Sequence, residues 1–351
     1  MKKHIAIFLC IALLFVLCAC GDKPAASGAE FPAATPSAES ELPTETAPSE
    51  PIEEDVPQPE ADPMNIMVLN GTTGFGMAKL MNDAAAGESA LRYDFFVETD
   101  ASNITAALIN GSVDIAALPT NAASVVYNKT GGEVQLLALN TLGVLYLVAD
   151  ESENISSLAD LEGKTVYAPA QNPSFVMQYI CQNAGVNVTI DNTYAQPADL
   201  RTVLAAGEVS LAVLPEPMVT IACSANDKLT VALDLTEEWA AINDSELVQG
   251  CLVVRRDFAE SHPAAIEIFL QEYEASIAFL SEDTAAAAQM IADAGIFAQA
   301  PVAEKAIPRC NVCFIRGIDM MYPMDGFLEA MFSIAPASIG GAIPAEDFYY
   351  T

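Results

Sequence analysis

The chain has 351 residues, with 47 Asp or Glu against 14 Lys or Arg, which gives a formal net charge of −33 at pH 7. This charge makes nucleic acid a poor partner, because phosphate backbones are bound by clustered Lys and Arg side chains. Residues 64–351 contain one histidine, His262. Any Ser/His/Asp or Cys/His catalytic scheme in this part of the chain would therefore have to use it.

Residues 1–20 have the pattern of an export signal. Lys2 and Lys3 precede an apolar stretch, Ile5 to Leu17, that is too short to cross a membrane. The segment ends in LCAC and resembles the lipobox of bacterial lipoproteins, with an ordinary secretory signal as the alternative. The resemblance implies cleavage before Cys20 and lipidation of its thiol. We therefore expect a protein anchored in the cell membrane through lipid, on the extracytoplasmic face.

Residues 21–63 are rich in Ala, Pro, Ser, Thr and Glu and contain few large apolar residues. Such a segment cannot bury enough apolar surface to offset its chain entropy. We expect a disordered tether between the lipid and a globular unit.

Residues 64–351 alternate short β-rich runs with helical runs, as in NIMVL, FGMAKLMNDAAAG, YDFFVE, ASNITAALINGSV and DIAAL. This alternation predicts an α/β fold in which helices flank a mainly parallel sheet. The length favours two lobes. No P-loop, G-x-G-x-x-G, H-E-x-x-H or G-x-S-x-G motif occurs, and we expect no enzymatic activity.

Polar, Gly or Pro residues cluster where predicted strands end and predicted helices begin. Ligands of open α/β sheets bind at these carboxyl ends, so the turns together predict a ligand site, although helix capping explains any one turn equally well. The candidate ligand-binding residues are Asn70, Gly71, Thr72, Thr73, Gly74, Phe75, Thr99, Pro119, Thr120, Asn121, Asn140, Gln171, Asn172, Ser174, Phe175 and Glu216.

The predicted turns contain almost no Lys or Arg, and neither Arg92 nor Arg201 is clearly aimed at the site. We therefore expect a small polar solute that is neutral or cationic, such as an aminopyrimidine or a flavin-like ring. Glu216, in the run LPEP, is the predicted acceptor, with a solvated loop acid as the alternative. The aromatic side chains that could cover the ligand are Phe75, Tyr127, Tyr146 and Phe175.

Five cysteines follow the signal, and an odd number excludes complete pairing within one chain. Cys310 and Cys313 form a CxxC, for which either a surface disulfide or two buried thiols is expected. A zinc site there would need two further ligands. We expect neither a metal nor a cofactor. The five cysteines are Cys181, Cys223, Cys251, Cys310 and Cys313.

Three segments resemble the substrate-binding proteins of ATP-binding-cassette (ABC) importers. Asp160–Val166 (DLEGKTV) is similar to the opening of their second lobe. Val253–Phe258, with His262-Pro263, is similar to the return strand and helix of the nitrate, sulfonate and thiamine-precursor branch, and Gly340–Pro344 with Asp347–Tyr349 is similar to its C-terminal signature. The resemblance implies a type II periplasmic-binding-protein fold, with lobe 1 at residues 64–149 and 250–351 and lobe 2 at residues 150–249.

The resemblance also implies a function. Such proteins close two lobes on a solute and deliver it to a membrane permease and its ATPase, and we expect this chain to act as a monomer. The strand-like runs Gly143–Val148 and Gly250–Val254 both begin with Gly, and they are candidates for the two connections that flex. A solute sensor, an enzyme of the same fold, and a sulfonate- or nitrate-type anion binder that uses helix N-termini are the alternatives.

Overall fold

The computed structural model describes residues 62–351. The predicted signal peptide, the predicted lipidation site at Cys20 and nearly all of the predicted tether lie outside these residues. In the part of the chain that is described, no helix combines the length and the apolar character needed to span a membrane.

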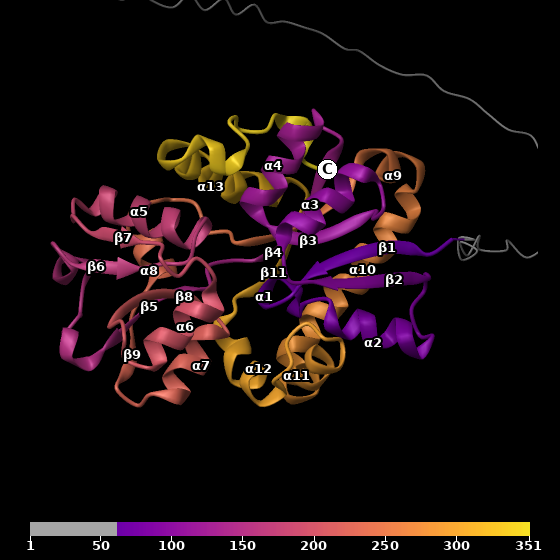
Figure 1. Cartoon of the computed structure of the whole chain (residues 1–351). Coiled ribbons are helices and arrows are strands. Elements are labelled where there is room, and N and C mark those ends of the chain that lie inside the picture. Colours follow the sequence, from indigo (N-terminus) through magenta and orange to yellow (C-terminus); the bar gives the residue numbers. More distant parts are fainter. Residues whose placement is uncertain (1–61) are drawn as a thin grey trace, which may run out of the picture. The chain divides into compact units, whose positions relative to one another are not determined.

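Two β-sheets organise the described residues (Figure 1). The six-stranded sheet has the order β11-β4-β10-β3-β1-β2, and the five-stranded sheet has the order β7-β6-β8-β5-β9. We call the first sheet with its helices lobe 1, and the second sheet with its helices lobe 2. The strands are β1 (Met64–Leu69), β2 (Tyr93–Glu98), β3 (Ile115–Pro119), β4 (Val134–Thr141), β5 (Leu145–Asp150), β6 (Thr165–Tyr167), β7 (Thr189–Asp191), β8 (Leu211–Pro215), β9 (Leu229–Asp234), β10 (Gly250–Arg255) and β11 (Val312–Arg316).

Most strands in each sheet run in one direction. β1, β2 and β3 are parallel, as are β6, β7 and β8, whereas β10 and β5 run against their neighbours. The predicted α/β class with mainly parallel sheets is confirmed, with one or more reversed strands in each sheet.

Helices cover both faces of each sheet (Figure 1). In lobe 1, α3, α4 and α13 pack on one face, and α2 and α10 pack on the other. In lobe 2, α5 and α8 pack on one face, and α6 and α7 on the other. The helices are α1 (Thr72–Phe75), α2 (Ala78–Ala86), α3 (Ala101–Asn110), α4 (Thr120–Thr130), α5 (Asn172–Ala184), α6 (Pro197–Ala205), α7 (Met218–Ala225), α8 (Leu235–Ala240), α9 (Arg256–Ser261), α10 (Pro263–Glu282), α11 (Thr284–Asp293), α12 (Ala300–Ala306) and α13 (Met321–Ile334).

Strand β3 shows how the sequence produces this layering. Ala116 and Leu118 pack into the core beneath α3, α4 and α13, whereas Ile115 and Ala117 pack into the core beneath α2 and α10. Successive side chains of a strand point to opposite faces. A strand that is covered on both faces is therefore apolar throughout, as the run Ile115–Leu118 (IAAL) is.

The chain passes between the sheets twice. The first passage is residues 142–144, between β4 and β5, and the second is residues 241–249, between α8 and β10. The passages lie side by side, because Gly250 is paired with Thr141 at their ends. Gly143 and Gly250 therefore lie in or next to the passages. That these segments flex stays a prediction.

The expected lobe boundary at residue 149 is too late. β5 (Leu145–Asp150) already pairs with β8 and β9 in the second sheet, so the chain leaves the first sheet at 142–144. The run 143–148 would suit a central strand of either sheet. The sequence alone therefore does not show to which sheet this strand belongs. The expected return at residue 250 coincides with the first residue of β10.

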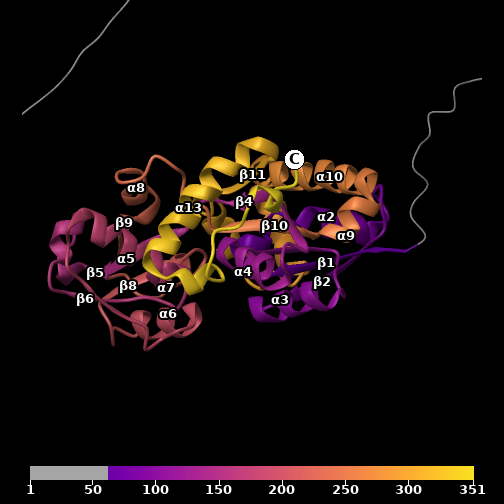
Figure 2. The ribbon, with the colours of Figure 1, turned by 90° about the horizontal axis from the view of Figure 1, so that it is seen from above.

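Helix α13 crosses the junction of the lobes (Figure 2). It packs against α4 of lobe 1 and α5 of lobe 2. Its Phe327 lies 6.3 Å, between ring centroids, from Trp239 of α8, and Trp239 lies 5.0 Å from Tyr179 of α5. An apolar core therefore runs without interruption from one lobe to the other on this face.

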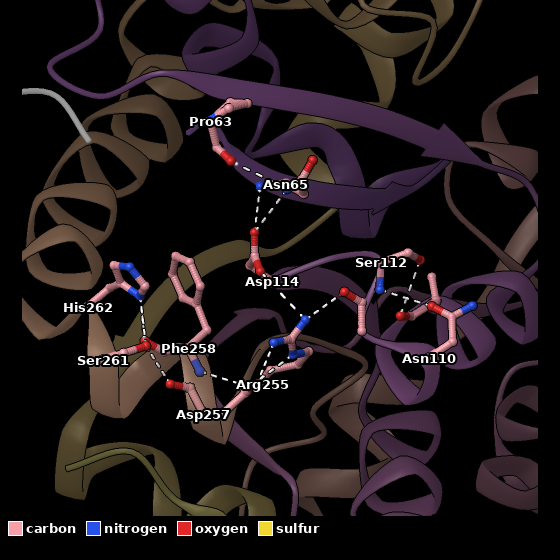
Figure 3. A network of polar contacts seen from close by, with 12 residues as sticks. Pro63, Asn65, Asn110, Ser112, Asp114, Arg255, Asp257, Phe258, Ser261 and His262 are labelled. Atoms are coloured by element: carbon pink, nitrogen blue, oxygen red, sulfur yellow. Dashed lines mark hydrogen bonds and ion pairs between the residues drawn. The ribbon is translucent and has the colours of Figure 1, made fainter. Parts of the chain in front are cut away.

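Polar side chains connect three inner strands of the first sheet at the strand ends that are farthest from the passages (Figure 3). Asp114, just before β3, accepts a hydrogen bond from the Asn65 N–H of β1 at 2.9 Å. Arg255, the last residue of β10, donates to the Gly111 carbonyl oxygen at 2.7 Å and to Asp257 at 2.9 Å. The bonds from Arg255 hold the pKa of the Asp257 carboxyl below its usual range. These strand ends lie away from the passages, and the cluster connects β1, β3 and β10 there.

Candidate functional site

The carboxyl ends of the parallel strands in the two sheets meet at one junction. Gly250 is opposite the last residue of β3 and the last residue of β4. Leu145, the first residue of β5, is opposite the last residue of β8. Because only residues 142–144 separate β4 from β5, the ends of β3 and β8 lie across a short gap from each other. This is the place where open α/β sheets bind ligands.

Two of the predicted turns come into direct contact at this junction. The Thr72 hydroxyl of lobe 1 donates to the Glu216 carbonyl oxygen of lobe 2 at 2.7 Å. Asn140, at the end of β4, donates to the Thr73 carbonyl oxygen at 3.1 Å and to the Tyr273 hydroxyl at 3.0 Å. The junction therefore brings together candidate residues from β1–α1, β4 and β8–α7.

The Glu216 carboxylate is buried and already has protein partners. Its side chain has 0% exposure. It accepts hydrogen bonds from the Thr220 N–H and hydroxyl, both at 3.1 Å, and from Arg309 Nε at 2.7 Å. In this arrangement no part of the carboxylate faces solvent, so a solute could reach it only after Arg309 has moved.

Arg309 is a residue of the candidate site that sequence reasoning missed. It ends the short 3₁₀ turn Ile307–Arg309 after α12, and its side chain is 44% exposed. Besides Glu216, it donates to the Thr220 hydroxyl at 2.9 Å. Its carbonyl oxygen accepts from the Tyr146 hydroxyl, also at 2.9 Å. The expectation of a neutral or cationic solute depended on the lack of Lys and Arg in the predicted turns, and Arg309 brings a guanidinium to the junction from outside these turns. The run IPRC contains no signal for this contact except an Arg in a turn just before a strand.

Neighbouring ionisable groups at the junction are held in their neutral forms. Burial raises the pKa of the Cys310 thiol to about 12. Burial, together with the carboxylates of Asp234 and Glu216, also raises the pKa of the Tyr146 hydroxyl. The arrangement therefore offers hydrogen-bond donors and one guanidinium, and it offers no activated nucleophile. Such a set can bind a solute but has no group poised for covalent chemistry.

The turns after β3 and β6 make mainly structural hydrogen bonds. The Thr120 hydroxyl donates to the Val248 carbonyl oxygen at 3.1 Å, and Asn121 Nδ2 donates to the Ser338 carbonyl oxygen at 3.3 Å. The Ser174 hydroxyl donates to the Pro169 carbonyl oxygen at 2.7 Å. A structural role therefore explains the hydrogen bonds of Thr120, Asn121 and Ser174.

The start of α5 has two features that such bonds do not explain. Gln171, just before the helix, has a φ of 72°, a left-handed conformation that is strained for a residue other than glycine. Asn172, the first residue of the helix, is 6% exposed, and its Oδ1 is buried without a hydrogen-bond partner. Unpaired buried acceptors are uncommon, so this atom has the capacity to accept a hydrogen bond from a ligand.

Other candidate residues lie away from solvent or away from the junction. Phe75 is 0% exposed within the core of α11 and α12, so it offers no face to a solute. The Tyr127 hydroxyl donates to Asp347 at 2.5 Å in the C-terminal segment. Thr99 precedes Asp100, whose carboxylate caps α3 by accepting from the Ser102 N–H at 2.8 Å. Of the four predicted aromatic side chains, Tyr146 is therefore the one whose hydroxyl bonds to the Arg309 segment.

All five cysteines that follow the signal are free thiols in the structure. Cys310 is fully buried and Cys313 is partly buried. Burial raises the pKa of the Cys313 thiol to about 12, as it does for Cys310. Of the two states expected for this CxxC, the structure therefore contains the pair of thiols.

A family model described as "ABC transporter, phosphonate, periplasmic substrate-binding protein" matches residues 80–300. Glu216 lies within this match, and Arg309 lies just beyond it. No curated protein sequence matches the chain.

Solved structures resemble the described unit along most of its length. An ABC transporter protein from Parabacteroides distasonis has a TM-score of 0.70 at 22% identity, covering 82% of this chain and 99% of that chain. The aliphatic sulphonate binding protein SsuA from Escherichia coli has a TM-score of 0.63 at 16% identity, covering 80% and 96%. A Candida albicans protein with "the generic periplasmic binding protein structural fold" has a TM-score of 0.52 at 12% identity, covering 82% and 93%. This likeness confirms the fold implied by the sequence.

Proposed function

The chain belongs to the family of phosphonate-type periplasmic substrate-binding proteins of ABC transporters, and we propose that it captures a small organic oxyanion and delivers it to a membrane permease. Members of this family bind solutes outside the cytoplasm and are not enzymes. The class of solute and the delivery step are the parts that we propose.

The observation that carries the proposal is Arg309 at the junction of the two lobes. A guanidinium is planar and presents paired N–H donors that match the oxygens of a carboxylate, a phosphonate or a sulfonate. The expectation of a neutral or cationic solute depended on the absence of such a group. With Glu216 enclosed by Thr220 and Arg309, the donor that remains partly exposed is cationic, and it favours an anion.

Hydroxyl and amide groups of the predicted turns complete the proposed site. Thr72 and Thr73 begin α1, just after β1, and the strained start of α5 offers Asn172. The N–H groups at the start of a helix favour negative charge, although each such contribution is modest. We propose that the oxyanion lies between Arg309 and these groups, and that the unpaired Asn172 Oδ1 accepts a hydrogen bond from an N–H or O–H group elsewhere on the solute.

Calorimetry with methylphosphonate, ethanesulfonate and 4-aminopyrimidine tests the charge of the solute. Arg309→Ala is expected to weaken binding of the anion about ten- to 150-fold, because a hydrogen bond to a charged group contributes about 1.5–3 kcal/mol. Arg316→Ala is the matched control, since Arg316 has a similar exposure and pairs with Glu267 on the surface. Binding of 4-aminopyrimidine without binding of either anion would restore the cationic-ligand expectation.

We also propose that the protein is held at the membrane by lipid on Cys20, as the lipobox-like run indicates. Cys20→Ala is expected to move the protein from the membrane fraction into the periplasm or the medium, because the acyl chains are its only predicted anchor. Fractionation followed by immunoblotting measures this, and Cys18→Ala is the matched control. Retention of the Cys20 variant in the membrane fraction would refute the anchor.

A further inference from the structure

The two lobes meet through an apolar core on one face of the sheets and through polar side chains on the other. On the α13 face, one core cluster contains Leu139 of β4, Leu147 of β5 and Trp239 of α8. On the opposite face, the core around Tyr146 and Leu214 in lobe 2 is separate from the cores of lobe 1. The lobes can therefore part on this second face without exposing a shared apolar core.

Polar contacts of Glu216 bridge the lobes on this second face. Glu216 belongs to lobe 2, between β8 and α7, whereas Arg309 follows α12, which packs into the lobe 1 core with Cys310. The Arg309 guanidinium reaches Glu216 Oε1 from both Nε, at 2.7 Å, and Nη2, at 2.5 Å. The Thr72 hydroxyl adds its 2.7 Å bond to the Glu216 carbonyl oxygen. The carboxylate and the backbone carbonyl oxygen of Glu216 thus both contact lobe 1.

Arg309 contacts the Glu216 carboxylate in the same way as we expect it to contact the captured oxyanion. A carboxylate presents two oxygens to a guanidinium much as a phosphonate or a sulfonate does. We propose that Glu216 is an internal competitor of the solute: it occupies Arg309 while the site is empty and keeps the lobes together, and it is displaced when the oxyanion binds. The displacement rests on the proposed function, whereas the role in holding the lobes together does not.

Competition of this kind lowers the apparent affinity for the solute. A ligand that binds only when Arg309 is released has its affinity reduced by the fraction of molecules in the released state. Removing the competing charge should therefore tighten binding. A residue that merely stabilises the fold, or that positions Arg309 for the ligand, would have the opposite effect or none.

Glu216→Gln tests the inference because it removes the charge and keeps the shape. In small-angle scattering of the ligand-free, full-length chain, this variant is expected to have a larger radius of gyration than the parent, since the predicted tether contributes equally to both. In calorimetry with methylphosphonate it is expected to bind about ten- to 150-fold more tightly. Glu153→Gln is the matched control, because Glu153 is paired with Lys164 within lobe 2, and it should change neither quantity.

Thr72→Val keeps the test decisive if Glu216→Gln does not fold. It removes the contact between Thr72 and Glu216 and leaves the bond from Tyr146 to the Arg309 carbonyl oxygen in place, so it should expand the ligand-free chain in the same direction, by a smaller amount. An unchanged radius of gyration in the folded variants overturns the role in holding the lobes together. Unchanged or weaker binding of methylphosphonate by Glu216→Gln overturns the competition. If the parent binds neither methylphosphonate nor ethanesulfonate, the proposed function and the competition both fail. The radius of gyration of the ligand-free variants then still tests whether Glu216 holds the lobes together.

Discussion

Replacing Trp239 with alanine is expected to lower the free energy of unfolding by about 3–5 kcal/mol. Trp239 is 0% exposed and packs between Tyr179 of α5 and Phe327 of α13. Its Nε1–H donates to the Ser245 carbonyl oxygen at 2.6 Å. The substitution therefore leaves a cavity in the core that joins the lobes, and it leaves a buried carbonyl without this partner.

Urea denaturation followed by far-ultraviolet circular dichroism measures this loss. Trp239→Phe is the control, because phenylalanine keeps most of the apolar volume and loses the hydrogen bond, so the expected loss is about 1–2 kcal/mol. Equal losses for the two variants would mean that the hydrogen bond, and not the packing of the ring, is what the site requires. A loss below about 1 kcal/mol for Trp239→Ala would contradict a shared core between the lobes.

The layers predicted from the sequence are confirmed, whereas the candidate site at the strand-end turns stays a prediction. A strand covered on both faces must be apolar throughout, and polar, Gly or Pro residues follow it in the turn. IAAL-PTN and LAVL-PEP can therefore be recognised from local pattern alone. The turn that contains Glu216 contacts the turn after β1 at the junction, through the bond between Thr72 and Glu216.

The chemistry inside the site could not be predicted in the same way. The pairing of Glu216 with Arg309 joins residues 93 positions apart, and local pattern carries no information about which turn reaches which. The same reasoning made Phe75 a candidate ligand contact because it follows a Gly-rich turn, although the ring turns into the core beneath α11 and α12. An inference about ligand charge drawn from the turns alone therefore omitted Arg309, the cation that we propose binds the solute.

Gly326→Ala is expected to destabilise the protein by about 2–3 kcal/mol, although alanine is the better helix former. Gly326 lies within α13, where alanine would favour the helix by about 1 kcal/mol. A Cβ atom there would lie 2.1 Å from the Ser245 Oγ and 2.5 Å from the Ser245 Cβ. No rotamer of Ser245 relieves a contact with its own Cβ, so α13 must move away from the second passage, and overpacking of this kind costs about 1–3 kcal/mol or more.

A double-mutant cycle identifies the cause. Ser245→Gly removes the atoms that would clash, so Gly326→Ala in the Ser245→Gly background should cost little or should stabilise the chain through helix propensity. Urea denaturation of the four proteins gives the coupling free energy, which is expected to be at least about 1.5 kcal/mol. Additive effects would mean that α13 does not lie against residues 241–249. The close approach supports the proposed opening of the lobes on the opposite face, because a helix held against this passage joins the lobes on the α13 side.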